Sequence, residues 1–152
     1  MQLNFFTFGR PKNVNLRQVL DSYLEIAGKK QRQFKVQYVA LGDKTPDKAI
    51  NPITVLYNHQ LSGTHTWFLA EWGEQFKTSK DFQTKLKTYW QDDQDLNIVC
   101  GNAFGWESVP LLAPHKFISL SGLTYNHELA SVMLAEQVFR FADYLVGGKY
   151  SK

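Results

Sequence analysis

The sequence predicts an α/β domain in which a mainly parallel β-sheet is flanked by helices. Short segments rich in β-branched and aromatic residues alternate with longer segments of helical periodicity. The stretches between successive strands are long enough to hold crossover helices, which favours βαβ units. The chain has 152 residues, of which 43% are hydrophobic and 20% charged, as is typical of one folded domain. We therefore expect residues 1–152 to form a single domain.

The first elements are a strand, a helix and a second strand. Residues 3–8 include three phenylalanines and end at a Gly-Arg-Pro turn, which predicts a short strand. Apolar residues then recur at helical spacing over residues 16–27, and either Asn13 or Asn15 can cap this helix. Residues 34–41 alternate and are rich in strand formers, which predicts the second strand.

The next stretch is less regular. Residues 45–61 contain two prolines, and we expect one short helix that begins at Pro52, because proline is tolerated in the first turn. Residues 65–70 are apolar and aromatic, which predicts a third strand. A polar loop is expected to follow this strand through Gly73.

The second half of the chain continues the alternation. We expect a helix over residues 79–90 and strands over residues 96–100 and 116–120. In the last helix, over residues 127–145, apolar side chains are spread around much of the helix surface and are not confined to one stripe. A helix of this kind is buried on several sides, and in a small domain this often means contact with a partner subunit. We therefore expect a homodimer.

Composition and residue spacing exclude several classes of protein. The single cysteine, Cys100, cannot form an intrachain disulfide. No signal peptide is recognisable at the start, and polar residues break the longest uncharged run, which predicts a cytoplasmic protein without a membrane span. No cluster of His, Cys, Asp and Glu has the spacing of metal ligands, so no metal site is expected.

The net charge of +3 arises in residues 1–50, with nine basic against four acidic residues, which favours a polyanionic partner.

Three loops are candidates for a ligand site, because ligands of open parallel sheets bind beyond the carboxyl ends of the strands. These loops are residues 70–74, 101–105 and 121–126. Glycines in them would let main-chain groups approach a ligand closely. The alternative is that these are ordinary turn glycines. Neither a P-loop nor a complete dinucleotide-binding Gly-x-Gly-x-x-Gly motif is present, which argues against nucleoside triphosphate and classical dinucleotide sites.

The carboxyl third of the chain contains a specific motif, Ser-Leu-Ser-Gly-Leu-Thr-Tyr-Asn-His at residues 119–127, followed by Leu-Ala-Glu-Gln-Val-Phe-Arg and a Gly-Lys-Tyr terminus. An apolar strand followed by a glycine loop precedes it at residues 97–105. Together with residues 68–76, these segments resemble the ribosomal large-subunit methyltransferase H family (RlmH), of the SPOUT class. The resemblance implies methylation of N3 of a pseudouridine in 23S ribosomal RNA with S-adenosylmethionine as cofactor. It also implies a trefoil knot near the carboxyl terminus and a homodimer.

The resemblance also suggests site residues. The implied cofactor contacts are Leu69, Gly101, Leu120, Ser121, Gly122, Leu123, Thr124 and Tyr125. For catalysis the candidates are Tyr150, which either stacks on RNA or closes the pocket, and His127, which either takes part in the reaction or caps and packs the last helix. Arg10, Lys12 and Arg17 are candidates for phosphate contacts with RNA, although a solvated helix face explains each of them equally well.

The chain departs from the family pattern at three positions. Asn102 replaces the second glycine of the glycine pair, Ser131 replaces an arginine early in the last helix, and Ser151 replaces a terminal histidine. These departures leave an alternative open, in which the chain is a noncatalytic RNA-binding or ribosome-assembly protein that kept the fold. A flavodoxin-like or receiver domain is disfavoured, because no acidic pair follows the first strand.

Overall fold

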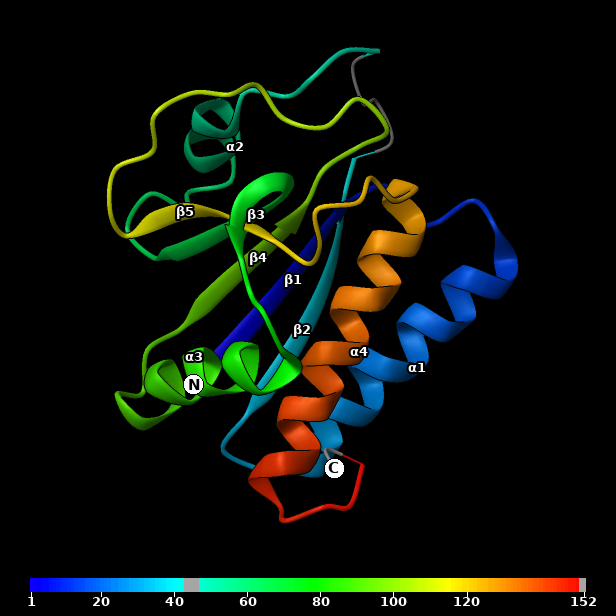
Figure 1. The fold of residues 1–152 in the computed structure, drawn as a ribbon, viewed down its shortest axis with the longest axis vertical. Coiled ribbons are helices and arrows are strands. Elements are labelled where there is room, and N and C mark those ends of the chain that lie inside the picture. The colour runs from blue at the N-terminus through cyan, green and yellow to red at the C-terminus, as the bar shows by residue number, and fades with distance from the viewer. Residues whose placement is uncertain (43–46, 151–152) are drawn as a thin grey trace.

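A single parallel sheet organises the computed structural model, which describes residues 1–42 and 47–150 (Figure 1). The strand order is β2-β1-β4-β3-β5, and every neighbouring pair is parallel. In chain order the elements are β1 (Gln2–Phe8), α1 (Val14–Lys30), β2 (Lys35–Leu41), α2 (Pro52–Asn58), β3 (His65–Gln75), α3 (Ser79–Gln91), β4 (Leu96–Cys100), β5 (His115–Ser119) and α4 (His127–Leu145). The predicted α/β class with a parallel sheet is therefore confirmed.

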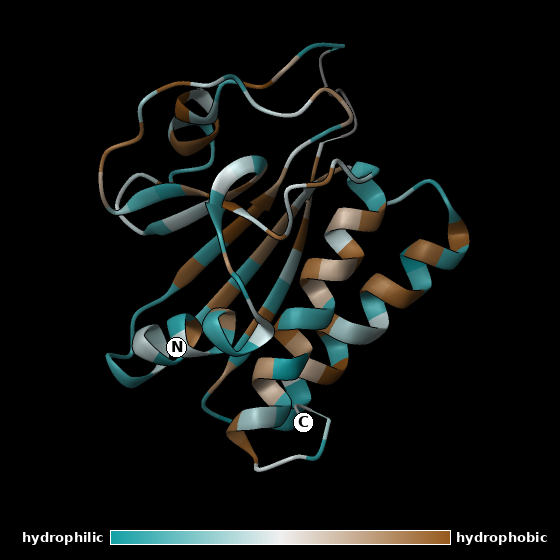
Figure 2. Ribbon diagram, in the orientation of Figure 1, coloured by the Kyte–Doolittle hydropathy of each residue, from teal (hydrophilic) through white to brown (hydrophobic). Residues whose placement is uncertain are grey.

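Both faces of the sheet are covered, as is typical of parallel sheets. Side chains alternate along each strand, so that Phe5 and Ile98 belong to one apolar cluster while Phe6 and Val99 belong to the other. The first cluster is completed by α1, α3 and α4, and the second by α2 and residues from the loop after β4. Figure 2 shows the apolar strands running through the centre of the molecule between these layers. Because side chains on both faces of the central strands are buried, these strands have nearly continuous hydrophobic sequences.

The helices begin where the local sequence supplies a cap. Asn13 accepts hydrogen bonds from the first turn of α1, so Asn13 rather than Asn15 is the cap. Thr78 and Asp81 form a capping box at α3, in which each side chain accepts the backbone N–H of the other residue. Asn126 caps α4 in the same way as Asn13 caps α1. Because Asn126 is the cap, α4 begins at His127, eight residues after β5 ends at Ser119.

The prediction of a loop after the third strand is wrong, because β3 continues to Gln75. The pairing of β3 with β5 shifts register between Leu69 and Glu74 and then resumes, with Glu74 opposite Ile118. Gly73 lies in this irregular stretch, and a Cβ atom there would be 2.6 Å from the backbone N and C atoms of Ile118. The missing side chain therefore allows the two strands to pack this closely.

Helices α1 and α4 lie side by side against one face of the sheet (Figure 1). Near the carboxyl ends of both helices, the ammonium group of Lys30 is 2.5 Å from the carboxylate of the buried Asp143. This hydrogen bond keeps the pKa of the Asp143 carboxyl below its usual value. The same carboxylate accepts the backbone N–H of Tyr150 at 2.9 Å. Asp143 therefore links the last described residues of the chain to the body of the domain.

Within residues 1–42 and 47–150, no helix has the length and apolar character that crossing a bilayer requires. The same residues contain no group of three or more His, Cys, Asp and Glu side chains that could hold a metal ion.

Candidate functional site

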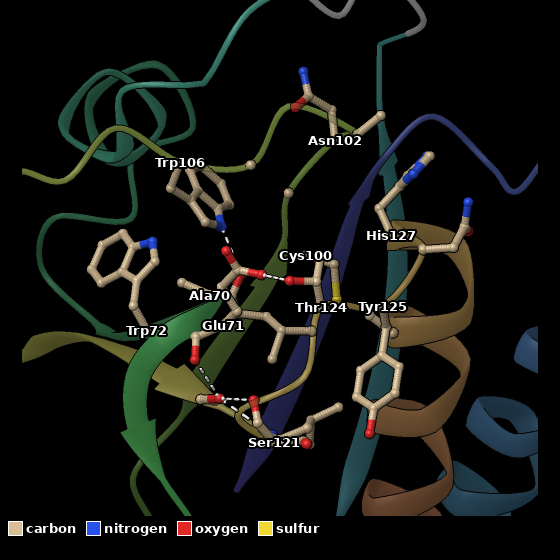
Figure 3. Close-up of a pocket in the computed structure, with 18 of the residues that line it drawn as sticks. Ala70, Glu71, Trp72, Cys100, Asn102, Trp106, Ser121, Thr124, Tyr125 and His127 are labelled. Atoms are coloured by element: carbon tan, nitrogen blue, oxygen red, sulfur yellow. Dashed lines mark hydrogen bonds between the residues drawn. The ribbon is translucent and has the colours of Figure 1, made fainter.

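A pocket of about 440 Å³ lies at the carboxyl ends of β4 and β5 and beside the irregular middle stretch of β3 (Figure 3). It is lined by three segments, residues 69–72, 100–106 and 119–127 without Gly122, and by Ala130 from α4. The three predicted segments therefore meet at one site, although the first of them, residues 70–74, lies within β3 rather than in a loop after it. Because β4, β3 and β5 are neighbouring parallel strands, the sheet brings together residues as far apart in sequence as Leu69 and His127.

One wall of the pocket depends on Gly101. The indole N–H of Trp106 donates a hydrogen bond to the carbonyl oxygen of Leu69 at 2.8 Å. A Cβ atom on Gly101 would lie 3.0 Å from that indole nitrogen. Asn102 stabilises the turn that follows, because its side-chain oxygen accepts the backbone N–H of Phe104 at 2.9 Å. Gly101 therefore lets the indole approach the ends of both β3 and β4.

A network of hydrogen bonds joins the end of β3 to the loop after β5. The hydroxyl of the buried Ser119 lies 3.0 Å from the carbonyl oxygen of Glu71 and 2.8 Å from that of Ser121. The side-chain oxygen of Ser121 accepts the backbone N–H of Leu123 at 3.1 Å. Across the pocket, the hydroxyl of Thr124 donates to the carboxylate of Glu71 (Figure 3). These contacts give the pocket a defined shape in which main-chain groups form much of the wall.

Seven of the eight residues expected to contact a cofactor line this pocket. They are Leu69, Gly101, Leu120, Ser121, Leu123, Thr124 and Tyr125. The exception is Gly122, which is not among the lining residues and around which an added Cβ would meet no atom within 4 Å. Contact of a cofactor with any of these eight residues stays a prediction, and Gly122 is the one that the pocket does not include.

The two candidate catalytic residues lie at opposite ends of α4. His127 begins the helix and lines the pocket, on the side opposite Trp106 in Figure 3. Tyr150 follows the other end, and the chain turns back there so that its ring packs edge to face on Phe139 with centroids 4.8 Å apart and lies under the Arg140 guanidinium. Phe139 is 12 residues beyond His127 on the helix, which corresponds to about 18 Å along its axis. One chain therefore does not bring His127 and Tyr150 together.

The Tyr150 hydroxyl is not an available base near neutral pH. Its hydrogen bond with Tyr23, followed by burial and the nearby Glu136 carboxylate, raises the pKa of Tyr150 to about 12. A phenol with this pKa stays protonated under physiological conditions. The side chain can therefore stack on a base or donate a hydrogen bond, but it does not take up a proton. Ser151, at the neighbouring family position, lies outside the described residues.

The basic residues near the N-terminus lie beside the start of α4. Arg10 lines a small second cavity together with His127, forms an ion pair with Asp21 and lies over the ring of Tyr38 at 5.4 Å. The backbone N–H of Lys12 donates to the Glu128 carboxylate. The guanidinium of Arg17 donates to the carbonyl of Pro11 at 3.0 Å. The chain thus places Arg10 near His127, and contact of Arg10, Lys12 and Arg17 with RNA stays a prediction.

Sequence reasoning missed several lining residues, above all Trp106 and Glu71. Trp106 follows the glycine loop directly, but nothing in its local sequence indicates a bond to Leu69. Glu71 lies within one of the loops singled out, where an acidic residue among apolar and small ones was the available signal. Two exposed aromatic side chains, Trp72 and Phe104, also line the pocket. Among the described lining residues, Glu71 is the only Asp, Glu, Lys or Arg.

Comparison with known proteins shows to which family the chain is related. A family model described as "Predicted SPOUT methyltransferase" matches residues 1–150. Proteins named ribosomal RNA large subunit methyltransferase H are also similar to the chain. The one from Saccharophagus degradans is 30% identical over 141 residues, which cover 88% of this chain and 90% of that protein. The one from Synechococcus sp. (strain CC9311) is 34% identical over 116 residues, 75% of each chain.

Other relatives match over a shorter region. The protein of the same name from Prochlorococcus marinus (strain MIT 9303) is 38% identical over 84 residues, 55% of this chain. In that relative and the one from Wolinella succinogenes, the chain covers 54% and 56% of the relative's length, or about half.

Proposed function

The chain belongs to the SPOUT methyltransferase family and, within it, to the ribosomal RNA large subunit methyltransferase H (RlmH) group, and from this premise we propose that it methylates ribosomal RNA. The proposed reaction uses S-adenosylmethionine and modifies N3 of a pseudouridine in 23S RNA, in the cytoplasm. The observation that carries the proposal is the pocket formed by the middle of β3 and the segments that follow β4 and β5, which seven of the expected cofactor contacts line.

The residues of the pocket fit this cofactor. Its volume of about 440 Å³ lies in the range of small-molecule sites, roughly 300–1,000 Å³. Leu69, Leu120 and Leu123 supply apolar surface for an adenine ring, and main-chain groups near Gly101 can hydrogen-bond its edge. No formal positive charge of a Lys or Arg lines the described pocket, which suits a ligand that is itself a cation.

When bound, the cofactor supplies the methyl group, whose bond to sulfur breaks with the electron pair left on sulfur as the bond to N3 forms. The contribution of the chain is to hold the target base in line, and orientation of this kind is worth up to about 7–11 kcal/mol. The N3 proton has to leave, and His127 is the imidazole that lines the pocket. A neutral imidazole there would accept this proton, which typically contributes about 10²–10⁴-fold to the rate.

Methylation is tested with ribosomal RNA from cells that lack this gene. We expect the purified protein with S-adenosylmethionine to add a methyl group at a large-subunit pseudouridine, measured by mass spectrometry of nucleosides. RNA from cells that keep the gene serves as the matched control, since its target is already modified and should accept no further methyl group. A protein that binds the cofactor but adds no methyl group to the unmodified RNA would support the noncatalytic RNA-binding or assembly role instead.

The proposed enzyme is a homodimer that pairs through α4. Large apolar side chains are exposed along this helix, with Leu129 45% and Met133 40% exposed one helical turn apart. Single exposed apolar residues are ordinary, but a row of them on one helix favours a partner surface. A second copy would also explain Tyr150, because its distance from the pocket of its own chain leaves the pocket of a partner as the place where it could act.

The dimer is tested by light scattering. The wild-type chain should have a mass of about 35 kDa at micromolar concentration, twice the 17.5 kDa of one chain. The double variant Leu129→Glu, Met133→Glu should shift toward 17.5 kDa, because two carboxylates would be buried in the interface. Tyr57→Glu with Leu112→Glu is the matched control, since these side chains are 83% and 82% exposed elsewhere. A wild-type mass of one chain would contradict the dimer.

A further inference from the structure

Glu71 carries the only formal charge of an Asp, Glu, Lys or Arg side chain among the described residues that line the pocket. The remaining lining side chains are apolar or aromatic, or are hydroxyls, amides, the Cys100 thiol and the His127 imidazole. The Glu71 side chain is solvent-exposed. Its carboxylate favours a cation over a neutral group of the same shape through Coulomb attraction, which becomes stronger where the ligand itself displaces water from between the two charges.

Two hydrogen bonds fix Glu71, one at its backbone and one at its carboxylate. The backbone carbonyl accepts a hydrogen bond from the buried Ser119, which anchors the residue within β3. Its side chain accepts the hydroxyl hydrogen of Thr124 from the facing loop, as Figure 3 shows. A carboxylate has about four acceptor positions, so the bond to Thr124 leaves others for a ligand.

The proposed reaction changes the charge of the cofactor at one atom. S-adenosylmethionine carries a positive sulfonium, whereas the product S-adenosylhomocysteine carries a neutral thioether, and the amino acid and adenosine parts are the same in both. We propose that Glu71 is the residue by which the pocket distinguishes the two, because its carboxylate stabilises the sulfonium and has no such interaction with the thioether. This inference rests on the proposed cofactor. Glu71 is then a specificity residue, which favours entry of the charged cofactor and release of the spent one.

The experiment compares three ligands by calorimetric titration of the full-length chain. S-adenosylmethionine and sinefungin are positive at the position of the sulfur, the second through an amine, and S-adenosylhomocysteine is neutral there. In Glu71→Gln the charge is lost but an oxygen remains to accept the Thr124 hydroxyl. We expect this variant to bind both cations about tenfold more weakly, equivalent to about 1.4 kcal/mol, and to bind S-adenosylhomocysteine as wild type does.

Glu74→Gln is the matched control, because Glu74 lies on the same strand, is paired with Lys116 at 2.7 Å and does not line the pocket. It should leave all three affinities unchanged. Equal weakening of all three ligands by Glu71→Gln would overturn the inference, since Glu71 would then contact a shared part of the ligands or only shape the pocket. Unchanged binding of the two cations would overturn it as well. If wild-type protein binds none of the three, the proposed cofactor itself is wrong, which is a distinct result.

Discussion

Replacing Gly101 by valine is expected to weaken S-adenosylmethionine binding by at least about 100-fold, equivalent to about 2.7 kcal/mol. A Cβ atom at this position would lie 3.0 Å from Nε1 and 3.2 Å from Cε2 of Trp106. The branched side chain would therefore push the indole away from the Leu69 carbonyl and occupy space at the pocket wall. Calorimetric titration of wild type and variant measures this loss directly.

The control for this variant is Gly63→Val. An added Cβ at Gly63 would meet no atom within 4 Å, and Gly63 does not line the pocket. This variant should bind the cofactor as wild type does. Thermal unfolding of both variants separates lost binding from lost folding. A Gly101→Val protein that keeps the wild-type Tm and binds normally would mean that the cofactor site lies elsewhere.

Truncating Phe141 to alanine is expected to lower the free energy of unfolding by about 3–5 kcal/mol. Phe141 is fully buried on α4, and its ring packs edge to face on the equally buried Phe34 with centroids 5.3 Å apart. The truncation leaves a cavity between α4 and the segment that leads into β2. Because domains of this kind have a total stability of about 5–15 kcal/mol, the loss is a large part of the whole.

Urea unfolding measures this change as a lower midpoint with an unchanged slope. Phe104→Ala is the comparison, since that ring is 56% exposed and its loss should change stability by about 0.5 kcal/mol or less. A Phe141→Ala protein as stable as wild type would show that α4 does not depend on this contact. The result also bears on the site, because α4 carries His127 into the pocket.

Local sequence signals were sufficient for most elements of the fold. The alternation of the strands and a cap of the first helix at Asn13 or Asn15 depend on residues a few positions apart, so they can be read without the tertiary structure. The structure then selected Asn13 and added the caps at Thr78 and Asn126. The continuation of β3 to Gln75 could not be read in this way. Its polar sequence is typical of a loop, and only the pairing with β5, through the close contact of Gly73 with Ile118, makes it a strand.

For the site, the sequence alone singled out the three segments that meet and, through the family motif, the candidate residues, although residues 70–74 lie within β3 and not in a loop after it. The tertiary structure alone decided which of them meet, because hydrogen bonds such as Trp106 to Leu69 and Thr124 to Glu71 join residues 37 and 53 positions apart. It placed His127 in the pocket and the Tyr150 ring against Phe139, 12 residues further along α4, a separation set by the rise of a rigid helix. It also left Glu71 as the only Asp, Glu, Lys or Arg among the described lining residues, since the charge of a pocket depends on the neighbours that folding brings to it.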